Sequence, residues 1–206
     1  MKLFAFMKKV ILSLGVFCSV ASAQSTIVYS GIKNLVIPTN FDGIYLDLDT
    51  GTVGGPELTG LDINPFFGGL GIANTANFQA VRSGTNILDP YLNLALGTSV
   101  NSSLNYATGE GGTDRNHIGV ASNQFHVSTD GYIGFRLTKN SGGAPVYGWM
   151  RVSLTANTSG ALIKDWAYEN NGGAILVGAI PEPSAGLITA LSGVLLLTRR
   201  KRLADS

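Results

Sequence analysis

Cysteine, histidine and charge are all scarce in this sequence of 206 residues. It contains one cysteine, two histidines and 13% charged residues. The lone Cys18 lies in an N-terminal segment that we expect to be removed, so disulfide bonds and thiol chemistry are excluded from the mature chain. Hydrophobic residues nevertheless reach 45%, which excludes a chain that is disordered throughout.

A surplus of basic residues is also missing from the middle of the chain. Between residues 24 and 180 there are 7 basic and 11 acidic residues, a net charge of −4. Proteins that bind nucleic acid need a basic surface that neutralises phosphates. We therefore predict no nucleic-acid partner. The absence of an internal repeat or of a shift in composition predicts a single domain over residues 24–179.

The N-terminus has the layout of a cleavable secretory signal peptide. Three lysines mark its start, the apolar run Val10–Val20 follows, and the small residues Ala21-Ser22-Ala23 end it. The apolar run is about half of the roughly 20 residues that a membrane-spanning helix needs, so a retained anchor is disfavoured. We predict that residues 1–23 form a signal helix and that a signal peptidase cleaves after Ala23.

The C-terminus, residues 180–206, carries a second signal in three parts. Pro181, Glu182 and Pro183 precede the apolar run Ala185–Thr198, and a basic cluster follows. The prolines keep their segment extended, the apolar run partitions into lipid, and the basic cluster stays on the cytoplasmic side. This order predicts a short hydrophobic helix that holds the protein transiently in the membrane. The basic cluster consists of Arg199, Arg200, Lys201 and Arg202.

The motif Pro181-Glu182-Pro183, with its adjoining hydrophobic segment and basic cluster, resembles the PEP-CTERM sorting signal of Gram-negative bacteria that make exopolysaccharide. The resemblance implies recognition by an exosortase, a membrane protease that removes the tail and releases or transfers the protein outward. A weaker resemblance covers most of the mature chain, because segments such as Gly131–Arg136 and Tyr147–Arg151 look like those of uncharacterised exported PEP-CTERM proteins. It implies an exported β-rich body and no particular activity.

The middle of the chain has the pattern of many short strands. Apolar and other residues alternate over residues 44–49, 132–137 and 146–154, and Gly, Asn and Ser clusters separate the runs. This pattern predicts an all-β fold, an antiparallel two-sheet sandwich or jelly roll, in which each strand has one buried face. We expect a loop over the polar stretch 72–80. The other predicted strands are 27–30, 35–38, 78–82, 91–95, 125–128, 162–168 and 174–178.

Few residues here are candidates for metal binding or catalysis. His117 and His126, with the nearby acids Glu110, Asp114 and Asp130, could be drawn as a metal site or a catalytic pair, but no His-x-His or His-Glu-x-x-His spacing supports it. Surface histidines are the favoured interpretation. The glycine-rich stretches match no nucleotide-binding fingerprint, and no Gly-x-Ser-x-Gly elbow is present. We therefore predict no catalytic residue, cofactor or metal.

Asp47 and Asp49, followed by Thr50 and Gly51, offer oxygens of the kind that calcium binds. The run lacks the third ligand and the distal glutamate of a calcium-binding loop. We favour solvated aspartates at the end of a strand.

Aromatic residues gather in two neighbouring predicted strands. Tyr147 and Trp149 share a strand face with Arg151, and Trp166 and Tyr168 follow in the next strand. Aromatic side chains of this kind pack in the cores of β-sandwiches, which is the favoured interpretation. The alternative is a glycan platform of Tyr147, Trp149 and Arg151, on which the apolar faces of sugar rings would stack.

Together these patterns predict an exported, non-enzymatic protein of the cell surface or extracellular matrix. It would leave by the general secretory route, be anchored transiently in the inner membrane, and associate with exopolysaccharide. The first alternative is a carbohydrate-binding or adhesive module, which requires an exposed aromatic patch. The second is an extracellular polysaccharide hydrolase, which requires two acids across a groove.

Overall fold

The computed structural model describes residues 26–69, 71–86, 89–107, 111–112, 125–126, 128–154 and 160–181. They belong to one unit, Thr26–Pro181. The predicted signal helix over residues 1–23 and the predicted C-terminal hydrophobic helix lie outside the described residues. Within the described residues, no helix has the length and hydropathy needed to cross a membrane.

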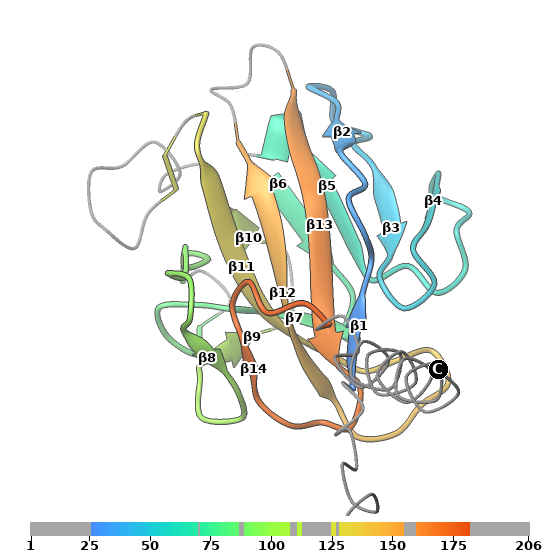
Figure 1. Ribbon diagram of the computed structural model, residues 1–206. Helices are drawn as coiled ribbons and strands as arrows, with labels where there is room; N and C mark the ends of the chain where they lie inside the picture. The colour runs from blue at the N-terminus through green and yellow to red at the C-terminus, as the bar shows by residue number, and fades with distance from the viewer. Residues whose placement is uncertain are drawn as a thin grey trace, which may run out of the picture. The chain divides into compact units, whose positions relative to one another are not determined.

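Seven strands in the described part of the chain form the larger sheet, in the order β1-β13-β12-β11-β7-β9, with β2 also paired to β13 (Figure 1). Every pair is antiparallel. The three longest strands lie at its centre. The strands are β1 (Ile27–Tyr29), β2 (Leu35–Ile37), β7 (Phe78–Val81), β9 (Tyr106–Ala107), β11 (Asp130–Leu137), β12 (Val146–Ser153) and β13 (Ala161–Glu169).

Two smaller antiparallel sheets complete the described fold. One has the order β10-β6-β5-β3-β4, and the other pairs β14 with β8. In Figure 1 they lie on opposite sides of the larger sheet. Their strands are β3 (Tyr45–Asp47), β4 (Thr52–Gly54), β5 (Ile63–Phe66), β6 (Gly71–Asn74), β8 (Ser99–Val100), β10 (Gly111–Gly112) and β14 (Ile175–Leu176), and a 3-10 turn, η1 (Phe67–Gly69), follows β5. The prediction of an all-β fold with antiparallel sheets is confirmed.

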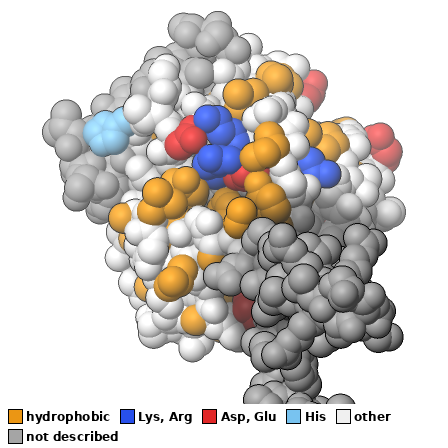
Figure 2. All heavy atoms as spheres, in the orientation of Figure 1, with side chains coloured by type: hydrophobic (Ala, Val, Ile, Leu, Met, Phe, Trp, Pro, Cys, Tyr) orange, Lys and Arg blue, Asp and Glu red, His pale blue; other side chains and the backbone are white. Residues whose placement is uncertain are grey.

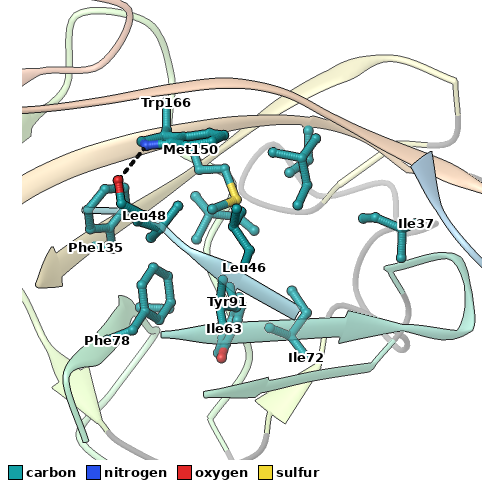
Figure 3. Close-up of a cluster of buried hydrophobic side chains, with 14 of the residues drawn as sticks. Ile37, Leu46, Leu48, Ile63, Ile72, Phe78, Tyr91, Phe135, Met150 and Trp166 are labelled. Carbon is teal, nitrogen blue, oxygen red and sulfur yellow. Dashed lines mark hydrogen bonds between the residues drawn. The ribbon is translucent and has the colours of Figure 1, made fainter. Parts of the chain in front are cut away.

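The main core lies between the larger sheet and the five-stranded sheet. Leu46 of β3 and Ile63 of β5 pack in one buried cluster with Phe135 of β11 and Met150 of β12 (Figure 3). The indole of Trp166 on β13 crosses this core and donates a hydrogen bond to the Leu48 carbonyl, 3.1 Å away. The predicted inward faces of residues 44–48, 133–137 and 146–154 all point into this cluster.

A second core covers part of the opposite face of the larger sheet. Tyr147 and Trp149 of β12 are buried there with Val100 of β8 and with Ile175 and Val177 of the β14 segment. The prediction that each strand has one buried face is therefore wrong for β12. The cause lies in the tertiary structure, because two short strands and their connections form a third layer over β12. The periodicity of β12 does not reveal this layer.

The predicted loop over residues 72–80 is wrong at both ends: residues 72–74 belong to β6, and residues 78–80 belong to β7, which confirms the predicted strand 78–82. Ile72, Phe78 and Ala80 are buried in the main core, on strands β6 and β7. The polar residues between them form the turn that carries the chain from the five-stranded sheet to the larger one, where Thr75 N donates to the Asp62 carbonyl at 3.0 Å. The largely polar residues 75–77 between the two strands make the stretch read as a loop in sequence.

We expect Gly148→Ala to lower the free energy of unfolding by about 1–3 kcal/mol, because the new methyl group would overfill the core. A Cβ atom at Gly148 would overlap the Phe135 ring and lie 2.6 Å from the Ala167 carbonyl oxygen. Gly54→Ala is the matched control, since its Cβ would meet nothing closer than Leu58 at 3.4 Å. Urea unfolding of the two variants measures the difference, and equal stabilities would contradict this packing.

Candidate functional site

The four aromatic side chains of β12 and β13 lie on two different faces of the larger sheet. In the β12–β13 register Trp149 is opposite Ala167, whereas Trp166 is opposite Met150. Tyr147 and Trp149 consequently belong to the second core, and Trp166 and Tyr168 to the main core. The four residues therefore form no common surface.

The predicted glycan platform of Tyr147, Trp149 and Arg151 is wrong, because its rings are not at the surface. Tyr147 is 9% and Trp149 2% exposed. The Trp149 indole donates a hydrogen bond to the Ala179 carbonyl at 3.1 Å, and the edge of Tyr132 packs against it with ring centroids 5.9 Å apart. Core packing, the favoured interpretation, accounts for both aromatic residues.

Arg151, the third member of the predicted platform, lies instead in a cluster of charged side chains that we call the ionic cluster: Arg151, Lys164, Asp130 and Asp165. A β-bulge builds it. Arg151 pairs with Asp165, but the next residue, Val152, pairs with Ile163, so Lys164 is an extra residue in β13. The bulge brings Lys164 and Asp165 together beside Arg151, as bulges commonly re-aim side chains.

The hydrogen bonds of the ionic cluster centre on Asp165, which is 1% exposed. Arg151 contacts both carboxylate oxygens, with Nε–Oδ1 2.9 Å and Nη2–Oδ2 2.5 Å, and Tyr29 donates its hydroxyl to Oδ2 at 2.8 Å. The bond to Asp165 raises the pKa of Arg151, whereas burial, followed by the bond to Asp165, raises that of Tyr29. Neither group exchanges a proton near neutral pH.

The rim of the ionic cluster is more open. Lys164 Nζ lies 2.5 Å from Asp130 Oδ1, and Arg151 Nη1 lies 3.7 Å from Asp130 Oδ2. Figure 2 shows basic and acidic side chains side by side on one face, bordered by hydrophobic side chains. Two cations balance two anions, so the cluster has no surplus positive charge to bind an anion.

A second group of charged residues, Asp47, Asp49 and Asp62, lies at the end of the main core. Asp62 accepts a hydrogen bond from Leu48 N at 2.8 Å, and its Oδ1 atom is buried and accepts none from the described residues. Burial, together with the charges of Asp47 and Asp49, raises the pKa of Asp62 to about 7. Tyr168 donates its hydroxyl to Asp49 at 3.2 Å and closes the group from β13.

The structure corrects the expectation for Asp47, which is 4% exposed and not solvated. Its Oδ1 atom accepts hydrogen bonds from Asp49 N at 2.9 Å and Thr50 N at 3.0 Å. Asp47 therefore holds the turn after β3 in place, as aspartates often do by bonding the backbone two residues on. Such a role explains the residue without a cation.

The predicted histidine and metal candidates come together nowhere in the described part of the chain. His126 is exposed, and His117, Glu110 and Asp114 lie outside the described residues. Among the residues that the structure describes, no three His, Cys, Asp or Glu side chains are placed to hold a metal ion. Of the predicted sorting motif Pro181-Glu182-Pro183 only Pro181 is described. Glu182, Pro183 and the basic cluster Arg199, Arg200, Lys201 and Arg202 lie beyond it.

Sequence reasoning missed Asp62 and the ionic cluster. A bulge of one residue leaves no trace in the alternation of β13, and Asp62 sits beside Gly60 and Leu61 in what reads as a turn. No family model, curated protein or solved structure matches the chain.

Removing the arginine of the ionic cluster should destabilise the fold far more than removing the lysine. Arg151→Met leaves the buried Asp165 with one described side-chain donor, Tyr29, and we expect a loss of about 3 kcal/mol. Lys164→Met breaks a pair whose side chains are 29% and 32% exposed, so the expected loss is below about 1 kcal/mol. Urea unfolding compares them, and similar losses would show that Asp165 is not the centre of the cluster.

The stability of the protein should fall as the pH rises from about 4 to about 7. In this range folded Asp62, with its pKa near 7, keeps a proton that the unfolded chain, with the ordinary value of 3.8, releases. Asp62→Asn carries no proton in either state and should remove this part of the pH dependence. The exposed Glu57→Gln is the control. The measurement is the free energy of unfolding of the original chain and of both variants at the two ends of this pH range. An Asp62→Asn variant with the same pH dependence as the original chain would refute the raised pKa of Asp62.

Proposed function

We propose that this protein is an exported, non-enzymatic protein of the cell surface or extracellular matrix, sorted and processed by an exosortase and associated with exopolysaccharide. The observation that carries the proposal is the order of the C-terminal signal, in which Pro-Glu-Pro, an apolar run and a basic cluster follow the body. In this proposal the body is a sandwich or jelly roll of two principal sheets, to which β8 and β14 add a small third layer. It is flanked by an N-terminal signal helix and a short C-terminal hydrophobic helix.

The end of the body supports a tail that can be removed without harm to the fold. Val177 N donates to the Thr98 carbonyl at 2.9 Å, and the Ala179 carbonyl accepts the Trp149 indole. The next residue, Ile180, is already 50% exposed. A cut beyond these contacts leaves both cores intact, as processing by an exosortase requires.

The proposed route has three steps. A signal peptidase removes residues 1–23, the apolar run Ala185–Thr198 holds the chain in the inner membrane, and the basic cluster keeps its end on the cytoplasmic side. The exosortase then removes the tail, and the body reaches the cell surface or the extracellular space. The net negative charge of the middle segment agrees with the expectation that nucleic acid is no partner.

Association, and not catalysis, is the mechanism that we propose. Asp47 and Asp62 are close enough for the charge of one to shift the pKa of the other, as the acid pair of a hydrolase would be. They are 4% and 1% exposed, so a polysaccharide cannot reach them. Asp165 is equally buried under Arg151 and Tyr29. Asp47 and Asp165 instead make hydrogen bonds within the fold.

Replacing Pro181, Glu182 and Pro183 by alanine should leave the chain exported but unprocessed and retained at the inner membrane. Immunoblotting of membrane and extracellular fractions measures tail removal and location. The control replaces Pro56 and Glu57 by alanine, because this exposed Pro-Glu pair lies in the body. If the motif variant were processed and localised like the original chain, the sorting proposal would fall.

A further inference from the structure

Three phenylalanine rings form a cluster at the surface, formed by the β2–β3 connection and the end of β5. Ring centroids of Phe41 and Phe66 are 5.5 Å apart, those of Phe41 and Phe67 5.8 Å, and those of Phe66 and Phe67 5.3 Å. Phe66 is buried, but Phe41 is 71% and Phe67 37% exposed. Single exposed apolar residues are ordinary, whereas a packed group of exposed rings marks a contact surface.

The backbone is strained to hold these rings in place. Phe67 has a φ of 49°, in the left-handed region that residues with a Cβ atom seldom adopt. Phe67 N donates to the Asn40 carbonyl at 3.0 Å and Gly68 N to the Pro38 carbonyl at 2.8 Å, which ties η1 to the β2–β3 connection. Strain of this kind persists where the surroundings enforce it, and it gathers at functional sites.

Two glycines leave room for the ring of Phe66, the buried member of the cluster. A Cβ atom at Gly71 would overlap the ring of Phe66, and one at Gly43 would lie 2.7 Å from Phe66 Cβ. Phe66 thereby fits under Phe41 and Phe67 and leaves them on the outside. Burial of Phe41 contributes little to stability at 71% exposure, so the core does not explain its position.

The charge of the two segments that carry the phenylalanine cluster limits the chemical class of a binding partner. Asp42 is the single ionisable residue in the segments 38–44 and 64–69 that form the cluster. One negative charge repels an anionic polymer and offers hydrogen-bond acceptors to hydroxyl groups. Thr39, Asn40 and Asp42 are exposed polar neighbours of Phe41. Flat apolar faces beside polar groups match a pyranose ring, which has an apolar C–H face and a rim of hydroxyls.

We propose that Phe41 and Phe67 form a stacking platform for neutral pyranose rings of a polysaccharide chain, with Asp42 accepting hydrogen bonds from sugar hydroxyls. The platform rests on the proposed function in one respect: an exported protein encounters polysaccharide outside the cell. It differs from the disproved platform on Trp149 in place and in exposure. Phe66 supports the two outer rings and does not touch the sugar.

Isothermal titration calorimetry tests the platform. The full chain in detergent is titrated with cellohexaose, xylohexaose and mannohexaose. We expect saturable binding of at least one of these neutral sugars and a loss of about tenfold or more in affinity on Phe41→Ala and on Phe67→Gly. Glycine accepts the positive φ at position 67, so this variant removes the ring while relieving strain. Leu96→Ala, at a residue 66% exposed, is the matched control and should bind like the original chain.

Three results would overturn the platform: no binding of any of the three sugars, equal binding by the phenylalanine variants, or tighter binding of oligoguluronate, an anionic sugar. Self-association that Phe41→Ala abolishes, without sugar binding, would show a second copy of the chain as the occupant instead. Export and tail removal of both phenylalanine variants should be normal. Failure of the platform is thus distinguishable from failure of the sorting proposal, which the Pro-Glu-Pro variant tests in cells.

Discussion

Burial of β12 on both of its faces is the constraint on which the described fold depends. Met150 and Val152 point into the main core, and Tyr147 and Trp149 point into the second core. The larger sheet is therefore a central layer and not the outer wall of a two-layer fold. Because both cores pack against this one strand, segments far apart in sequence, such as β3 and β14, lie on its two faces.

The second core also determines where the body ends. Trp149 reaches the Ala179 carbonyl, and Val177 is buried in the same cluster. Among the described residues, the end of the body is thus held by a central tryptophan. A chain that is cut beyond this point keeps its hydrophobic contacts, which makes a removable tail compatible with a stable body.

Alternation in sequence predicted the inward faces of β3, β11 and β12 correctly, because each carries apolar residues at every second position and faces the main core. It could not predict the third layer, since a Tyr or Trp between two inward residues fits both an exposed platform and a second core. Strand β6 was missed because the turn that follows it is polar. The polar residues of this turn satisfy backbone groups between two sheets, a requirement that only the tertiary structure creates.

The candidate sites were less predictable than the fold. Arg151 was singled out from its strand face, but its partner Asp165 depends on a bulge of one residue in β13. Asp62 resembles any turn aspartate until β3 and β13 close around it. In sequence, Phe66 and Phe67 are two adjacent aromatic residues before Gly68 and Gly69. Phe66 is buried and Phe67 is exposed, at a positive φ that no alternation pattern encodes.

The same constraint limits where this protein can present aromatic rings to a partner. Where β12 is covered on both faces, its aromatic rings are buried against neighbouring side chains and cannot contact a partner. The uncovered part of its outer face carries the ionic cluster. A connecting segment outside both cores can expose aromatic rings, but other contacts must then keep these rings from folding back onto the protein surface. The hydrogen bonds from Phe67 and Gly68 to the β2–β3 connection do this, at the cost of a strained backbone. The exposure of Phe41 and Phe67 on this strained turn and its neighbouring connection is the reason to regard them as a surface for binding.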